Sequence, residues 1–214
     1  MQTRYSSIAL VLFLITGLMP CFSTAQPVMP DYTAVTDERL LNPEAQNWLS
    51  YRGTLDGWGF SRLDEIDDSN VQQLEPVWSF STGVLGGHEA PPIVNNGVMF
   101  ITTPGNLVYA IDAASGDLLW RYQHDLPETY IAFHRTNRGV ALYGDKVYTA
   151  TLDARVVALD AATGRKVWDS TVQDNNFGYY ITMAPLAIDD KILVGTYGGE
   201  LGIRGLIVAL DAAT

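Results

Sequence analysis

The chain has 214 residues, and its 24 acidic side chains against 13 basic ones give a formal net charge of −11. This acidic balance argues against nucleic acid and anionic membrane surfaces as partners and suits a basic soluble partner. The single cysteine, Cys21, lies in a segment that we expect to be removed, so no disulfide is expected.

Residues 1–25 have the three-part pattern of a secretory signal peptide. Arg4 supplies the positive start, residues 8–19 form an apolar run, and the small residues 23–25 precede the expected cleavage site. The apolar run is too short to span a bilayer comfortably. A lipid anchor on Cys21 is the alternative, although the residues before it fit a lipidation motif poorly. We therefore expect an exported, periplasmic protein.

Four segments follow before the first clear repeat. Residues 26–46 show little periodicity and are expected to form an extended arm. Residues 47–60 are rich in glycine and aromatic side chains, which indicates a packed loop. Residues 67–74 carry acidic side chains and a serine that can cap a short helical turn. Residues 76–81 alternate polar and apolar side chains, and this pattern predicts a strand.

An 11-residue unit then recurs along the chain. It is spelled AIDAASGDLLW at 110–120 and ALDAATGRKVW at 158–168, and a third copy begins at Ala209. In each complete copy the aspartate can hydrogen-bond the backbone of a tight turn, and the glycine can adopt the positive φ that a short hairpin needs. The unit is therefore predicted to be the end of one strand, a turn and the start of the next.

Each repeat of about 48 residues holds roughly four short alternating segments separated by Gly, Asn or Asp turns. A four-stranded antiparallel unit of this size is typical of a β-propeller blade, and we predict an all-β propeller with about three blades in this chain. A β-solenoid is the alternative, but its coils are usually shorter. The tryptophan of each unit is expected to pack against the neighbouring blade, where the turn glycine permits close approach.

The third repeat departs from the other two by six extra residues. They fall in 195–205, GTYGGELGIRG, which holds five glycines and one carboxylate, Glu200. Such a loop exposes backbone N–H groups and can approach a flat or anionic ligand, while Glu200 could bind a hard cation through oxygen. A flexible hairpin with a solvated glutamate explains the spacing equally well.

Three polar residues open the three repeats at comparable positions. Glu89 leads the first, Arg138 the second and Thr182 the third. Glu89 alone is better explained by solvation than by an inward-facing ligand contact, but in a propeller all three would point toward one axis. Their convergence therefore predicts a binding site.

The runs GHEAPPIV, NRGVALYG, ITMAP and GGELGIRG, set between copies of the repeated unit, resemble the pyrroloquinoline quinone (PQQ) dependent alcohol dehydrogenases. The likeness covers about residues 47–214. The repeated unit resembles that family's tryptophan-docking motif, which also occurs in related propellers without the cofactor. The combination of GGE-x-G-x-RG, NRG and the glutamate of GHEAP is much more specific.

This resemblance implies an eight-bladed propeller that holds PQQ near its axis together with a Ca²⁺ ion. At the matching positions, Glu89 would hydrogen-bond the quinone and Arg138 would pair with a PQQ carboxylate, for which a guanidinium fork is well suited. Thr182 would donate its hydroxyl to the cofactor.

The glycine-rich loop completes the implied site. Gly198 and Gly199 would contact PQQ through their backbone, and Glu200 would be a Ca²⁺ ligand. In the family mechanism the metal polarises a quinone carbonyl, an aspartate takes the alcohol proton, and hydride passes to the quinone.

Two departures from the family pattern affect the cofactor site. The family commonly carries a vicinal Cys-Cys disulfide where this chain has Ala132 and Phe133, so a disulfide against one PQQ face is absent, and Phe133 could cover that face by stacking. The serine before the glycine pair is replaced by the bulkier Tyr197, so that contact is not carried over.

The third copy of the repeated unit stops at Thr214, and three units do not close a ring of eight. We therefore expect an N-terminal fragment. The family's catalytic aspartate and metal-binding asparagine are expected beyond residue 214, and no catalytic residue is predicted here.

The expected function is oxidation of a primary alcohol or similar hydroxyl compound, with electrons passed to a c-type cytochrome or a membrane quinone. The alternative is a non-catalytic propeller that serves as a binding or assembly scaffold, which would have no reason to hold Glu89, Arg138 and Glu200 together. A membrane-bound sugar dehydrogenase is a third possibility, but a single short apolar run argues against several spans. No C-x-x-C-H haem motif occurs.

Overall fold

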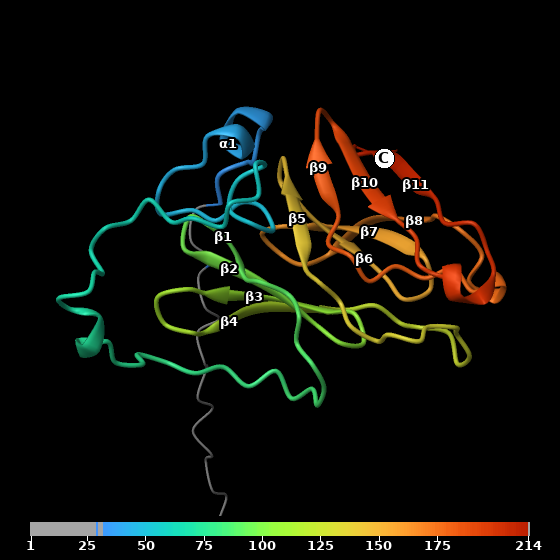
Figure 1. The fold of residues 1–214 in the computed structure, drawn as a ribbon, viewed down its shortest axis with the longest axis horizontal. Helices are drawn as coiled ribbons and strands as arrows, with labels where there is room; N and C mark the ends of the chain where they lie inside the picture. The colour runs from blue at the N-terminus through green and yellow to red at the C-terminus, as the bar shows by residue number, and fades with distance from the viewer. Residues whose placement is uncertain (1–28, 30–31, 214) are drawn as a thin grey trace, which may run out of the picture.

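The computed structural model describes residue 29 and residues 32–213, so the predicted signal peptide lies outside the described residues. Within this part the chain forms three antiparallel sheets whose strands follow one another in chain order. Figure 1 shows the sheets side by side, with β5 between the first sheet and the third. Among the described residues, no helix is long and apolar enough to cross a membrane.

The first sheet contains β1 (Ile93–Asn95), β2 (Val98–Thr103), β3 (Leu107–Asp112) and β4 (Leu118–Gln123). The second contains β5 (Val140–Tyr143), β6 (Lys146–Ala150), β7 (Arg155–Asp160) and β8 (Lys166–Thr171). The third contains β9 (Leu186–Ile188), β10 (Lys191–Gly195) and β11 (Ile207–Asp211). The predicted all-β repeat of short strands is therefore confirmed.

The first two sheets match in the details of their registers. Ala110 pairs with Trp120 in the first sheet and Ala158 with Trp168 in the second, and the register shifts directly after each alanine. The same bulge thus recurs in both copies of the repeated unit. Residues 156–159 of β7 are buried on both faces of the strand, because the second sheet packs between the first and the third.

Trp120 joins the first sheet to the second, as the repeated unit predicts for its tryptophan. The indole of Trp120 lies over Gly164, and its Nε1 donates a hydrogen bond to the carbonyl oxygen of Ala161 at 2.9 Å. The φ of Gly164 is +69°, so this glycine provides both the positive φ and the missing Cβ that the contact requires.

An additional tryptophan, Trp78, docks in the same way before the first sheet. It lies over Gly116, and its Nε1 donates to the carbonyl oxygen of Ala113 at 3.1 Å. The strand predicted at 76–81 is nevertheless wrong, because the segment has no ladder partner within the described part of the chain. Val77 beside the docked indole is 86% exposed.

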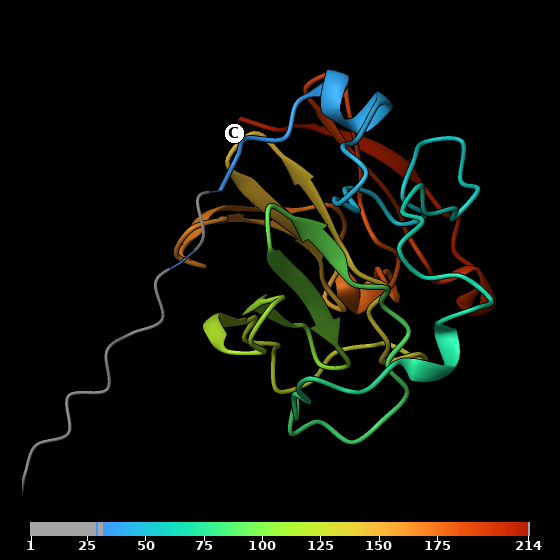
Figure 2. The same cartoon turned by 90° about the vertical axis from the view of Figure 1, so that its left-hand side faces the viewer.

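The N-terminal segment differs from the expected extended arm, because it contains the helix α1 (Asp37–Leu41). Thr36 caps this helix by accepting a hydrogen bond from the backbone N–H of Arg39, and Leu40 is buried. Asp37 accepts hydrogen bonds from the hydroxyl of Tyr143 and from the N–H of Asp189. Figure 2 shows the helix lying close to the third sheet rather than projecting away.

Within residues 32–213 there are also three 3₁₀ turns: η1 (Val71–Gln73), η2 (Asn175–Phe177) and η3 (Gly199–Leu201). The first confirms the short helical turn predicted at 67–74. The third contains the predicted metal ligand Glu200.

Candidate functional site

The three polar residues that open the repeats lie together in the structure. Glu89 comes four residues before β1, Arg138 two before β5, and Thr182 four before β9. A guanidinium nitrogen of Arg138, Nη2, lies 2.9 Å from Oε2 of Glu89, and Nη1 donates to Oγ1 of Thr182 at 2.5 Å. The backbone N–H of Arg138 also donates to the carbonyl oxygen of Thr182 at 2.9 Å. We call these three residues the arginine cluster.

One residue of the arginine cluster is buried, and the other two are partly exposed to solvent. Thr182 is fully buried, whereas the side chains of Arg138 and Glu89 are 30% and 48% exposed. A guanidinium has five N–H donors, and the two contacts to Glu89 and Thr182 occupy one on each terminal nitrogen. The remaining N–H groups of Arg138 could bind a planar carboxylate in bidentate geometry.

Two cavities meet at Glu89. One, of about 600 Å³, is lined by residues that include Trp48, Arg52 and His88. The other, of about 560 Å³, is lined by residues that include Phe133 and Thr136. These volumes are large enough for a small organic cofactor.

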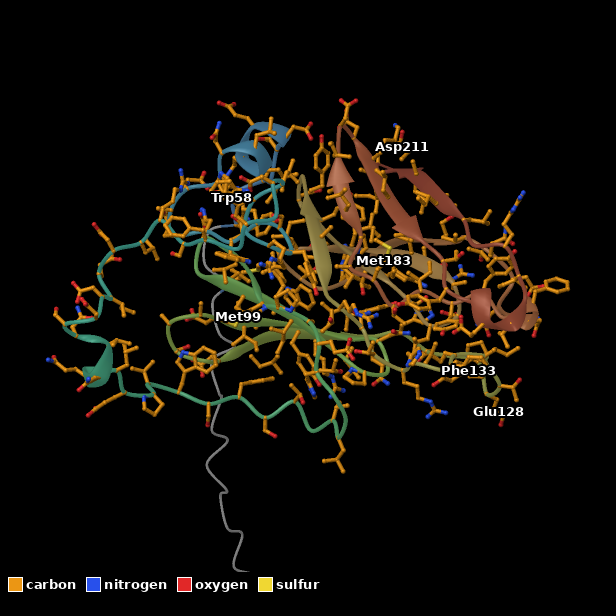
Figure 3. All side chains as sticks on the ribbon, in the orientation of Figure 1. Trp58, Met99, Glu128, Phe133, Met183 and Asp211 are labelled. Atoms are coloured by element: carbon orange, nitrogen blue, oxygen red, sulfur yellow. The ribbon has the colours of Figure 1, made fainter. Side chains whose placement is uncertain are left out.

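The second cavity has two features that suit a polar, aromatic ligand. The hydroxyl of Thr136 is buried and has no hydrogen-bond partner within the described ranges. The ring of Phe133 is 59% exposed and lies on the loop after β4, as Figure 3 shows. A planar ligand in this cavity could stack on Phe133 and satisfy Thr136.

Arg138 itself lines a smaller apolar cavity of about 340 Å³. Its lining comes from the loop at 49–51 and from the chain around β5 and β9 and includes Met183, which Figure 3 shows near the centre of the molecule. In the arginine cluster, Arg138 thus lines the apolar cavity, and Glu89 lines the two larger cavities.

Glu200 lies in the glycine-rich loop and is fixed by a tyrosine. The hydroxyl of Tyr180 donates to Oε1 of Glu200 at 2.6 Å. This hydrogen bond is the main reason that the pKa of Glu200 lies below its usual value. The carboxylate therefore stays ionised to a lower pH than an ordinary glutamate, and the ionised form is the one that binds a cation.

The two glycines before Glu200 differ in whether a larger residue could take their place. Gly198 has a φ of +126°, and a Cβ on it would lie 2.5 Å from the carbonyl oxygen of Gly178. Only glycine fits that position. Gly199 has an ordinary φ, and a Cβ there would meet no atom of the described chain. The packing around Gly199 therefore does not explain why glycine occurs at this position.

The arginine cluster and Glu200 are connected through one segment. Thr182 belongs to the cluster, and Tyr180, two residues earlier, holds Glu200. No three His, Cys, Asp or Glu side chains within the described ranges come together as a metal site. Glu200 can therefore supply one oxygen ligand, and a complete metal site needs ligands from elsewhere.

The sequence patterns do not single out Tyr180. It follows Tyr179 in the run GYYIT, where no spacing or charge pattern distinguishes either tyrosine. Its neighbour in space is Tyr197, and the two rings stack at 5.3 Å between centroids. Tyr197, which replaces the family's serine, therefore packs against a second aromatic residue, Tyr180.

The described part of the chain holds two four-stranded antiparallel sheets and one three-stranded sheet, and a docked indole joins the first sheet to the second. Polar residues precede the first strand of each sheet, and this arrangement defines a partial β-propeller. A model of the glucose/ethanol/alcohol dehydrogenase β-propeller domain, which bears the name PQQ, matches residues 48–214. The chain therefore belongs to the PQQ-dependent alcohol dehydrogenase family.

Individual relatives agree with this assignment. Quinohemoprotein alcohol dehydrogenase ADH IIB of Pseudomonas putida is 40% identical over 206 residues, which cover 92% of this chain and 29% of the relative. The structure of quinohemoprotein alcohol dehydrogenase ADHIIG from Pseudomonas putida HK5 matches with a TM-score of 0.78 and 38% identity, over 84% of this chain and 27% of that one. A europium-containing methanol dehydrogenase matches with a TM-score of 0.77 and 36% identity, over 82% and 32% of the two chains. The chain spans less than a third of the length of these relatives.

Proposed function

We propose that this chain is part of a periplasmic, PQQ- and Ca²⁺-dependent dehydrogenase that oxidises a primary alcohol or a similar hydroxyl compound. Electrons would pass to a c-type cytochrome or a membrane quinone. Family membership supports the cofactor and the reaction class, and one relative is named 1-butanol dehydrogenase (cytochrome c). The acidic balance of the chain suits a basic soluble electron acceptor.

The observation that carries this proposal is the arginine cluster. Arg138 is anchored by Glu89 and Thr182 from the two neighbouring repeats, yet it keeps N–H donors free of these contacts. Because its orientation is set by two partners, the guanidinium pays little conformational entropy when a carboxylate binds. PQQ carries carboxylates, so Arg138 would orient the cofactor. Glu89 and Thr182 would hold Arg138 and would themselves hydrogen-bond the cofactor.

The remaining predicted residues have separate roles. Gly198 and Gly199 would present backbone to the cofactor, and Glu200 would give one oxygen to the metal. When bound, PQQ accepts a hydride from the alcohol carbon, and the metal acts as a Lewis acid. The base that takes the hydroxyl proton is expected beyond residue 214, so no catalytic residue is assigned in this chain.

The test is made on the protein from its complete reading frame. PQQ binding is followed by the change in protein fluorescence, and dye reduction is followed with a panel of alcohols, with and without Ca²⁺. Arg138→Ala is expected to weaken PQQ binding by about 10-fold or more, because a charged hydrogen-bonding partner is lost. Glu200→Ala is expected to weaken metal binding. Arg121→Ala and Glu128→Ala, at exposed positions, serve as matched controls.

Failure of the intact wild-type protein to bind PQQ would overturn the proposal and favour a scaffold. Activity without added metal after chelation would overturn the metal part alone. Equal PQQ affinities in Arg138→Ala and Arg121→Ala would show that Arg138 does not bind the cofactor.

A further inference from the structure

We propose that Tyr180 is a positioning residue that orients Glu200 as a metal ligand, and that Tyr197 holds Tyr180 in place. This inference rests on the proposed metal site and goes beyond it. It assigns a role to two residues that lie outside the set predicted from the sequence.

The first observation is the placement of the Tyr180 hydroxyl. Tyr180 is fully buried, and its hydroxyl donates to Oε1 of Glu200 at 2.6 Å. A buried phenol has few ways to satisfy its hydroxyl, so this hydrogen bond fixes the carboxylate in one orientation. With Oε1 engaged, the lone pairs of Oε2 and the second lone pair of Oε1 are available to a cation.

The second observation is the way Tyr180 itself is held. Its ring stacks on Tyr197 with an angle of 29° between the ring planes. The backbone N–H of Tyr197 donates to the carbonyl oxygen of Tyr180 at 2.7 Å, and the Tyr197 ring makes a T-shaped contact with His134. The phenol therefore has a fixed position before any metal binds.

The third observation is the close approach of the two chain segments. Leu201 packs on Gly178, where a side chain would clash with it. The backbone of Gly198 lies against the carbonyl oxygen of the same Gly178. The turn that carries Glu200 is thus fastened to the segment 178–180 on either side of the carboxylate.

These contacts give Tyr180 the role that outer-shell residues have in metal sites. Such residues orient the ligand, and removing them typically lowers metal affinity about 10–100-fold. The same segment carries Thr182 of the arginine cluster two residues later. It would therefore keep the metal ligand and the cofactor-orienting arginine in a constant relative position.

The test compares Tyr180→Phe with Tyr179→Phe in the complete protein. Each variant loses one hydroxyl, but the hydroxyl of Tyr179 donates to the carbonyl oxygen of Arg204 instead of a carboxylate. Tb³⁺ is the probe, since it is a hard cation that emits when a nearby tyrosine is excited, and Ca²⁺ is measured by competition. Tyr197→Phe and Tyr197→Ala separate the ring of Tyr197 from its hydroxyl.

Tyr180→Phe is expected to weaken Tb³⁺ and Ca²⁺ binding about 10–100-fold, with Tyr179→Phe within about twofold of the wild type. At saturating Tb³⁺, emission excited through tyrosine is expected to fall in Tyr180→Phe, while emission excited directly stays constant. Tyr197→Ala is expected to weaken binding, and Tyr197→Phe to retain it.

Equal metal affinities in Tyr180→Phe and the wild type would overturn the inference. Glu200→Ala is measured in parallel to separate this failure from failure of the proposed function. If Glu200→Ala also binds Tb³⁺ like the wild type, Glu200 is not a ligand and the metal part of the proposed function fails together with the role of Tyr180.

Discussion

Trp120 lies directly on Gly164 of the neighbouring sheet, so that a Cβ on Gly164 would come within 2.5 Å of the indole ring. The hydrogen bond from the same indole to the carbonyl oxygen of Ala161 fixes the ring in this position. The contact joins the first sheet to the second. It also makes the repeated unit a structural joint, because the glycine of one copy receives the tryptophan of the copy before it.

Gly164→Ala is expected to lower the free energy of unfolding by about 2–4 kcal/mol. The new methyl group overpacks against the indole, and the residue must keep a positive φ. Gly97→Ala is the control, since Gly97 has a φ of +78° but nothing lies within 4 Å of a Cβ there. Gly97→Ala is expected to lower the free energy of unfolding by only about 1–2 kcal/mol. Urea unfolding of both variants measures the difference, and equal losses would contradict the packing role.

Glu44 is expected to make stability depend on pH. The hydrogen bond from Arg39 and, to a smaller extent, the one from Asn47 lower the pKa of Glu44 from about 4.5 to about 2. Because the pKa is lower in the folded state, the stabilisation is present above pH 4.5 and is lost as the pH falls toward 2. The Glu44 side chain is 42% exposed, so solvent screening limits the effect to about 1 kcal/mol or less.

Glu44→Gln should therefore be less stable than the wild type at pH 7, and the two should converge near pH 2. Thermal unfolding across this range makes the comparison. Glu38→Gln, at an exposed position in α1, is the control. A stability difference that stays constant down to pH 2 would be inconsistent with the ion pair.

Thr182→Val is expected to weaken PQQ binding about 10-fold. The variant keeps the shape of the side chain but removes the oxygen that accepts a hydrogen bond from the Arg138 guanidinium at 2.5 Å. Thr182→Ser keeps that oxygen and should bind PQQ nearly as well as the wild type. Fluorescence titration with PQQ distinguishes the two, and a wild-type affinity in Thr182→Val would show that the threonine does not hold Arg138 for the cofactor.

Phe133→Ala is expected to weaken PQQ binding about 3–10-fold, because the exposed ring lines the cavity next to Glu89 and would stack on a planar ligand. Phe133→Trp should retain the affinity. Phe60→Ala removes another exposed ring, 70% accessible, that lines neither of the cavities at Glu89, and should leave binding unchanged. The same titration measures all three variants, and similar losses in Phe133→Ala and Phe60→Ala would exclude a specific stacking role.

The repeated architecture could be read from the sequence because its signals are local. Alternating side chains predict the strands, and the aspartate and glycine of each 11-residue unit predict the turns between them. The contact of Trp120 with the next copy also follows from the repeat. Glu89, Arg138 and Thr182 could be grouped because each precedes the first strand of its sheet.

The conformations and contacts of segments outside the repeated strands were decided only by the tertiary structure. Residues 76–81 alternate like a strand, but a strand exists only where a partner backbone accepts its hydrogen bonds, and no partner lies within the described part of the chain. Residues 37–41 look aperiodic, yet a threonine cap and the burial of Leu40 make them helical. Tyr180 meets Glu200 because two irregular loops pack against each other at Gly178 and Gly198. Such packing depends on three-dimensional shape and leaves no periodic signal in the sequence.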